Sequence, residues 1–137
     1  MSHRHTCKAL ILHCIDFRLG QPIKAFLEKN DLLGDCDIVS LAGAVKNIVA
    51  PPNEHVRELV LNQLRIAVDR HKIKKVILMN HTNCAAYSKF NSAADEERQH
   101  VHDLHEAKRR VEPICSVVYL TLARIDESDQ VTIGPVD

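Results

Sequence analysis

The sequence predicts an α/β fold with a mainly parallel β-sheet of four to five strands flanked by helices. Short apolar runs alternate with longer segments in which apolar residues recur every three to four positions, as in strands that alternate with helices. Residues 9–15 are almost wholly apolar, as expected of a strand covered on both faces of a parallel sheet. The length suits a single domain over 1–137, in which residues 1–6 are expected to be disordered.

The other elements follow in the same alternation. Gly34 ends the first predicted helix, and Asn53 is placed to cap the second after two prolines. Cys84 is expected to open a helix of its own. The predicted helices are 22–33, 53–71 and 93–111. The predicted strands are 9–15, 37–41, 76–79, 117–122 and 131–133, with a turn over 126–129 before the last.

Composition disfavours several classes of partner. Lys plus Arg and Asp plus Glu both total 18, so no net charge attracts nucleic acid or anionic lipid. Aromatic residues make up only 4% of the chain, which disfavours stacking on bases. No stretch approaches the roughly 20 apolar residues of a membrane span, and no apolar export signal precedes residue 9. The sequence therefore predicts a cytoplasmic protein that binds neither nucleic acid nor membrane.

Two short motifs place metal-binding side chains where predicted strands end. Cys14-x-Asp16-x-Arg18 follows the first strand, and His81-x-x-Cys84 follows the third. Because ligands of such sheets bind beyond the carboxyl ends of the strands, the two cysteines and the histidine are expected to converge there. Two thiolates and one imidazole supply three of the four ligands of a tetrahedral zinc site. The fourth position is then open to water, as in a catalytic zinc site.

The carboxylate and guanidinium of the first motif are expected to assist at this site. Asp16 lies two residues from Cys14, so an extended backbone puts both side chains on the same side. Arg18 is within reach to orient that carboxylate and to lower its pKa. Two thiolates neutralise the charge of Zn²⁺, so a bound water should be less acidic than at a trihistidine site, where its pKa is about 7. Activity should therefore favour alkaline pH. Asp16 either accepts a hydrogen bond from that water or becomes the fourth ligand and closes the site.

The combined motif resembles the zinc signature of the β-class carbonic anhydrases, and the order of strands and helices is similar over nearly the whole chain. The resemblance implies a β-carbonic-anhydrase-like fold and the reversible hydration of carbon dioxide to bicarbonate by a zinc-bound hydroxide. It implies one Zn²⁺ per chain held by Cys14, His81 and Cys84, with Asp16 and Arg18 as the catalytic pair. It also implies a homodimer with active sites near the interface, and pairing of dimers into tetramers.

Several residues depart from that family pattern. Phe17 stands where the family usually has a small residue, Ala85 where it has glycine, and Ser40-Leu41 where it has Arg-Asn. Family members also usually carry a helical N-terminal arm, whereas here the first strand is expected to begin almost at once. Two alternatives therefore stay open. One is a hydrolase of carbon disulfide or carbonyl sulfide on the same fold. The other is a zinc-binding homologue without activity, in which Asp16 permanently occupies the fourth position. The expected substrate-pocket residues are Phe17, Gly43, Ala44 and Tyr87.

The remaining cysteines and histidines are interpreted as structural or surface residues. Five unevenly spaced cysteines suit metal binding or free thiols better than a disulfide framework. A solvated face is favoured over a second metal site for the histidines of the charged helix 93–111. The residues interpreted in this way are Cys7, Cys36, Cys115, His100, His102 and His105, while His3 and His5 fall in the segment expected to be disordered.

Overall fold

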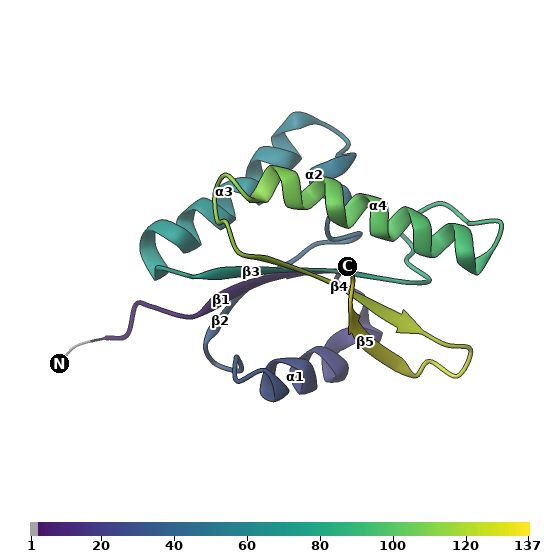
Figure 1. Cartoon of the computed structure of the whole chain (residues 1–137), viewed down its shortest axis with the longest axis horizontal. Coiled ribbons are helices and arrows are strands. Elements are labelled where there is room, and N and C mark those ends of the chain that lie inside the picture. The colour runs from purple at the N-terminus through teal and green to yellow at the C-terminus, as the bar shows by residue number, and fades with distance from the viewer. Residues whose placement is uncertain (1–2) are drawn as a thin grey trace.

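The computed structural model describes residues 3–137 and contains a five-stranded sheet between two layers of helices (Figure 1). The strand order is β2-β1-β3-β4-β5; β1 to β4 are parallel and β5 is antiparallel to β4. The predicted α/β class with a mainly parallel sheet is thereby confirmed. The strands are β1 (Ala9–His13), β2 (Cys36–Ser40), β3 (Lys75–His81), β4 (Val118–Ile125) and β5 (Val131–Pro135).

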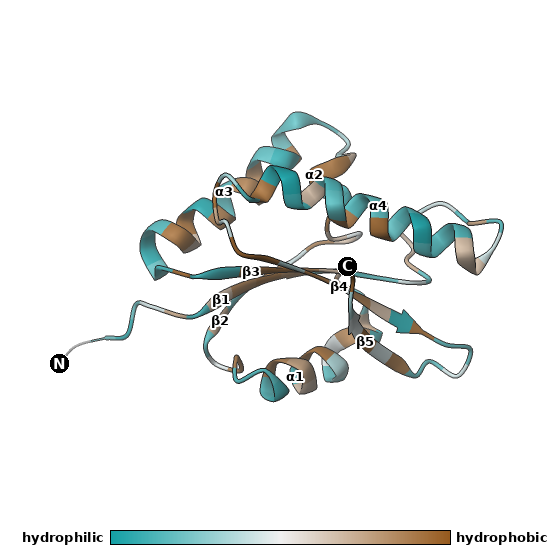
Figure 2. Ribbon diagram, in the orientation of Figure 1, coloured by the Kyte–Doolittle hydropathy of each residue, from teal (hydrophilic) through white to brown (hydrophobic). Residues whose placement is uncertain are grey.

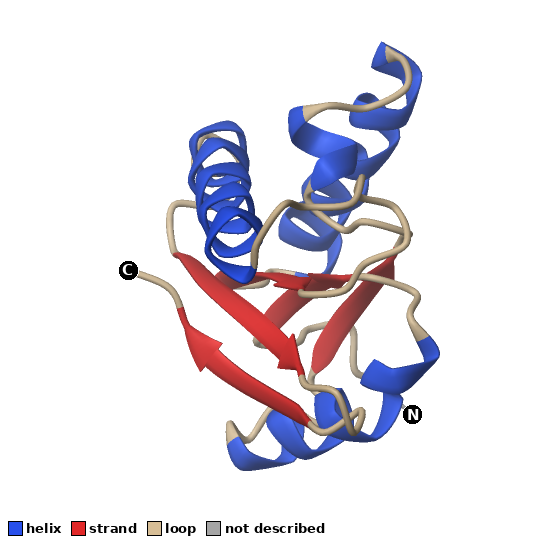
Figure 3. Cartoon of the chain, turned by 90° about the vertical axis from the view of Figure 1, so that its right-hand side faces the viewer, coloured by secondary structure: helices blue, strands red, loops and turns tan. Residues whose placement is uncertain are grey.

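The helices cover both faces of the sheet (Figures 1 and 3). Helix α1 (Gly20–Lys29) follows the short 3₁₀ turn η1 (Phe17–Leu19) and covers one face. Helices α2 (Lys46–Val49), α3 (Glu54–His71) and α4 (Ala93–Val111) cover the other. None of the helices in residues 3–137 combines the length and the apolar character needed to cross a membrane.

The central strands bury side chains on both faces. Leu10 and Leu12 of β1 pack in the cluster that includes α2, α3 and α4, whereas Ala9 and Ile11 pack in the cluster that includes α1. Successive side chains of a strand point to opposite faces, so a strand between two helical layers is apolar at every position. Figure 2 shows this as hydrophobic central strands and largely hydrophilic outer helix surfaces.

Helix caps explain which predicted helix bounds are confirmed. The Asn53 side chain accepts a hydrogen bond from the Val56 N–H, as predicted for the N-cap of α3. Ser92 caps α4 in the same way through the Asp95 N–H, and α4 covers the predicted residues 93–111. Asp16 caps η1, so β1 ends at His13, earlier than predicted.

Helix α2 was not predicted; it spans only four residues, too few for a periodic pattern.

The expected helix at Cys84 is wrong. The residues that follow form a single turn, in which the Tyr87 N–H donates to the Cys84 carbonyl at 3.1 Å. Asn83 has a φ of 56°, a left-handed conformation that does not lead into an α-helix. The next helix begins only where Ser92 provides a cap.

The solvated face expected for the histidines of α4 is wrong for His100. Its side chain is fully buried, with its ring 4.6 Å from that of Tyr87. Position 100 lies on the same helical stripe as Leu104 and Ala107, which also face the core. His102, by contrast, is exposed as predicted.

The segment before Cys7 has no regular secondary structure where it is described. Residues 1–2 lie outside the described range, and residues 3–6 belong to no helix or strand. Disorder over 1–6 stays a prediction, as does the assignment of 1–137 to one domain.

Candidate metal centre

The carboxyl ends of β1 and β3 bring Cys14, His81 and Cys84 together. Their ligand atoms all lie within 4.8 Å of one another, the two sulfurs are 3.9 Å apart, and all three side chains are buried. The chain leaves β1 into α1 on one face of the sheet and leaves β3 into α4 on the other. Ligands bind at such reversals of strand order. The predicted convergence is confirmed, and the group could bind a metal ion.

The imidazole of His81 is oriented as a metal ligand. Its Nδ1 lies 2.7 Å from the Thr82 carbonyl. A carbonyl only accepts, so Nδ1 carries the proton and Nε2 keeps a free lone pair. This Nε2 is buried and has no hydrogen-bond partner within residues 3–137. An unsatisfied buried nitrogen costs about 1–3 kcal/mol. Two sulfurs and this nitrogen form a donor set that suits a thiophilic divalent ion such as zinc.

The contact between the two cysteines favours a state in which one of them is a thiolate and the other keeps its proton. A hydrogen bond from the Cys84 thiol lowers the pKa of Cys14 well below its usual range, and the same contact raises the pKa of Cys84. The backbone N–H of Gly43 also points at the Cys14 sulfur, 3.4 Å away. Burial disfavours the charged imidazole of His81, but the adjacent Cys14 raises the pKa of His81 overall. Cys14 is therefore prepared to bind a cation.

The predicted pairing of Asp16 with Arg18 is confirmed. Arg18 donates through Nε to Oδ1 at 3.0 Å and through Nη2 to Oδ2 at 2.8 Å, and its backbone N–H donates to Oδ1 at 2.9 Å. These bonds lower the pKa of Asp16 to about 2. Oδ2 also lies 3.9 Å from Nε2 of His81. The ionised carboxylate thus stands beside the ligand group while Arg18 holds both of its oxygens.

Glycine is strongly favoured at position 43. Its φ is +82°, and a Cβ added there would lie 3.0 Å from the Cβ of Ala86. The turn brings the Gly43 N–H to Cys14 and leaves the next residue, Ala44, fully buried. The Tyr87 ring packs in the same cluster as the two ligand cysteines, whereas Phe17 is 90% exposed. A substrate-pocket role for these residues stays a prediction.

Comparison with known families decides the family of the chain. A family model described as "Putative carbonic anhydrase" matches residues 4–133. The chain belongs to this family. It is 29% identical over 106 residues to an uncharacterized protein of Rickettsia bellii, covering 73% of this chain and 65% of the relative. It is 25% identical over 105 residues to an uncharacterized protein of Rickettsia conorii, covering 72% of this chain and 56% of that relative. The aligned part is thus less than two thirds of the length of these curated relatives.

Solved structures confirm the predicted β-carbonic-anhydrase-like fold. The carbonic anhydrase of Streptococcus mutans superposes with a TM-score of 0.59 at 18% identity, covering 100% of this chain and 87% of that one. The β-carbonic anhydrase isoform I of Trichomonas vaginalis superposes with a TM-score of 0.60 at 12% identity, covering 97% of this chain and 86% of that one. The apo form of a carbon disulfide hydrolase superposes with a TM-score of 0.58 at 10% identity, covering 93% of this chain and 78% of that one.

In this carbonic anhydrase family member, Asn83 links the two motifs. Its Oδ1 accepts from Nη1 of Arg18 at 2.9 Å, and its carbonyl accepts from Nη2 at 3.0 Å. Its own N–H donates to Glu96 of α4 at 2.7 Å. Asp129 adds a carboxylate 3.5 Å from Nη1. The sequence reasoning missed both partners of Arg18. Asn83 lies inside the second motif, but its contact with Arg18 appears only when β1 and β3 lie side by side.

A buried polar network supports the turn that carries Cys84. The Asn80 amide donates to the Tyr87 hydroxyl at 2.9 Å and lies 3.0 Å from Nδ1 of His100. The Tyr87 hydroxyl donates in turn to Asp103 at 2.8 Å. The sequence reasoning missed this network, because its members are far apart in the chain and two of them lie on a helix expected to be solvated.

Proposed function

We propose that this protein catalyses the zinc-dependent, reversible hydration of carbon dioxide to bicarbonate. The observation that carries the proposal is the buried, unpaired Nε2 of His81 facing the sulfurs of Cys14 and Cys84. Membership of the carbonic anhydrase family supports it. We propose one Zn²⁺ in this centre, held by these three residues, with Asp16 and Arg18 as the catalytic pair.

The roles of the chain's own residues follow from their contacts. Zn²⁺, when bound, would supply a Lewis acid that lowers the pKa of a water molecule and makes it nucleophilic at alkaline pH. Asp16 would accept a hydrogen bond from such a water and orient it, because Arg18 keeps the carboxylate ionised and fixed. Asn83 holds the far side of the guanidinium. The proton released during turnover then passes to solvent.

The same contacts bear on the alternative of a zinc-binding homologue without activity. For Asp16 to occupy the fourth coordination position, it would have to give up its hydrogen bonds to Arg18. The observed pairing therefore favours an open site. A crystal structure at alkaline pH with Asp16 on the metal would instead favour the inactive homologue.

The pocket that receives carbon dioxide is proposed to lie beside the metal centre, lined by Gly43, Ala44 and Tyr87, with Phe17 at its exposed rim. The half-buried Tyr87 ring packs in the cluster of the ligand cysteines and offers apolar surface that suits a small uncharged substrate. Ala44 is fully buried in the other core cluster and would support this wall from behind. Gly43 keeps the backbone close to Cys14.

The direct test is stopped-flow hydration of carbon dioxide by the zinc-loaded protein at alkaline pH. We expect acceleration above the buffer rate, and we expect Cys14→Ser to reduce the rate to that of the buffer, because a ligand is lost. Cys115→Ser is the matched control, since Cys115 is also a buried cysteine but packs in the other core cluster. If the wild type and Cys14→Ser accelerate hydration equally, the proposal is wrong.

A carbon disulfide or carbonyl sulfide hydrolase is the second candidate. The fold is shared with a carbon disulfide hydrolase. Two exposed apolar side chains, Ile15 (64%) and Phe17 (90%), flank Asp16 in the sequence, which favours an apolar approach to the centre. Sulfide release from carbon disulfide, without hydration of carbon dioxide by the same zinc-loaded sample, would favour this candidate over the first.

We also propose that the chain forms a homodimer, which can pair further into tetramers. Strand β2 lies at the edge of the sheet, and its Ile38 is 59% exposed. Burying such a side chain contributes about 2 kcal/mol on each protomer, so Ile38→Asp is expected to weaken a symmetric dimer roughly 1,000-fold. Analytical ultracentrifugation over a range of concentrations measures this change. A wild-type protein that sediments only as a monomer would contradict the proposal.

The location and the partners of the protein also stay predictions. We propose a cytoplasmic protein whose small-molecule substrates are carbon dioxide and bicarbonate and which has no nucleic-acid or membrane partner. Fractionation of the source cells tests the location.

A further inference from the structure

A second group of metal-ligating side chains lies at the opposite end of the sheet, near the amino ends of strands β1 and β2. Cys7, Asp37 and His71 each offer one ligand atom, and these atoms lie within 4.8 Å of one another. The three residues come from the segment before β1, from β2 and from the last turn of α3. Cys7 and Cys14 are separated by the length of β1, about 23 Å along an extended chain. The group is therefore distinct from the proposed catalytic centre.

Hydrogen bonds hold these three residues in place. The Cys7 N–H donates to the His71 carbonyl at 3.0 Å, which fixes Cys7 against the end of α3. Nδ1 of His71 donates to Oδ2 of Asp37 at 2.7 Å, which orients both side chains. The His71 side chain is 41% exposed and that of Asp37 is 29% exposed, so the group is reachable from solvent.

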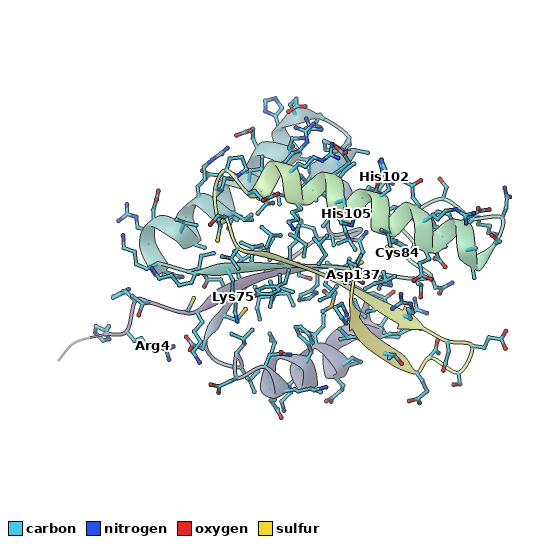
Figure 4. All side chains as sticks on the ribbon, viewed as in Figure 1. Arg4, Lys75, Cys84, His102, His105 and Asp137 are labelled. Atoms are coloured by element: carbon cyan, nitrogen blue, oxygen red, sulfur yellow. The ribbon has the colours of Figure 1, made fainter. Side chains whose placement is uncertain are left out.

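The three residues line a cavity of about 210 Å³ that His5 also lines. One water occupies about 30 Å³ of liquid, so the cavity has room for an ion and its waters. His5 offers a fourth donor two residues from Cys7. Among residues 3–137, Arg4 is the one arginine or lysine that lines the cavity, and it is paired with Asp35. In Figure 4, Arg4 lies at the left of the view and Cys84 lies well to its right, beyond the centre.

We propose that Cys7, Asp37 and His71 bind a second divalent ion of the zinc type, with His5 as the further ligand. A thiolate, an imidazole and a carboxylate are all ligands of Zn²⁺, whereas Mg²⁺ and Ca²⁺ require oxygen ligands. The carbonyl end of α3 adds a favourable field for a cation. On binding, the Cys7 thiol releases its proton to solvent and the thiolate takes the metal. The ion replaces the hydrogen bond between Nδ1 of His71 and Asp37, and the imidazole then carries its proton on Nε2. The ion ties the segment before β1 to β2 and α3.

Co²⁺ titration of a Cys14→Ser/Cys84→Ser variant isolates this site, because that variant lacks both thiolates of the first centre. We expect one Co²⁺ per chain with a sulfur-to-cobalt charge-transfer band, and we expect added Zn²⁺ to bleach the band. Adding Cys7→Ser should abolish the band, whereas adding Cys115→Ser should leave it intact. No band in a folded variant, or a band that survives Cys7→Ser, overturns the proposal.

Native mass spectrometry of the otherwise unaltered chain provides the second measurement. We expect two Zn²⁺ per chain in the wild type and one in Cys7→Ser, with the rate of carbon dioxide hydration unchanged. A single Zn²⁺ in both proteins overturns the proposal. Because metal is counted without any assay of turnover, failure of the proposed hydration activity and failure of this site are distinguishable.

Discussion

Replacing His81 by alanine is expected to remove the metal ion from the centre at the carboxyl edge and to abolish carbon dioxide hydration. The change deletes the buried Nε2 that faces the two sulfurs, and Cys14 and Cys84 alone share a proton rather than complete a site. The rate should fall to the uncatalysed level, which for an enzyme of ordinary acceleration is a loss of roughly 10⁶-fold.

Metal content after gel filtration, together with stopped-flow rates, checks this prediction. A Cys7→Ser background removes the contribution of the second proposed site. His55→Ala is the matched control, because this exposed histidine of α3 lies outside both metal groups and should keep metal and rate. A folded His81→Ala protein that retains the metal would show that the ligand assignment is wrong.

Replacing Asp16 by asparagine is expected to leave metal binding intact and to lower turnover about 100-fold. Asparagine keeps the shape of the side chain but loses the charge that lets Asp16 hold the reacting water, an effect in the range of general acid–base catalysis. Asp129→Asn is the control. Asp129 also lies near Arg18, but its side chain is 70% exposed, and its loss should change the rate less than twofold or so. Full turnover by Asp16→Asn at the wild-type metal content would exclude this role.

The pH dependence of stability gives the same variant a second readout. Arg18 lowers the pKa of Asp16 in the folded protein to about 2, below the ordinary value of 3.8. A depressed folded pKa means that the contribution to stability is complete above pH 3.8 and is lost as the pH falls through about 2. The contribution is at most about 2 kcal/mol. Urea unfolding of the wild type and Asp16→Asn should therefore differ at pH 7 and converge toward pH 2. The activity profile near neutral pH should not contain the titration of Asp16.

Local patterns in the sequence predict most of the architecture because strands and helices impose different spacings on apolar residues. The run over 9–15 indicates a strand buried on both faces, and Leu10 and Ile11 indeed pack in opposite clusters. The same local reasoning fails at Cys84, where Asn83 adopts a left-handed conformation. It fails again at His100, since a polar residue on a charged helix shows no sign of burial until Tyr87 packs against it.

The two motifs alone predict the first centre. The spacing of Cys14, His81 and Cys84 at strand ends indicates the donors and the end of the sheet where they meet. The contact of Asn83 with Arg18, and the grouping of Cys7, Asp37 and His71, emerge only from the folded arrangement of the chain. Periodicity reports which way a side chain points within its own element. Contacts between residues thirty or more positions apart depend instead on strand order and register, which the packing of the whole chain selects.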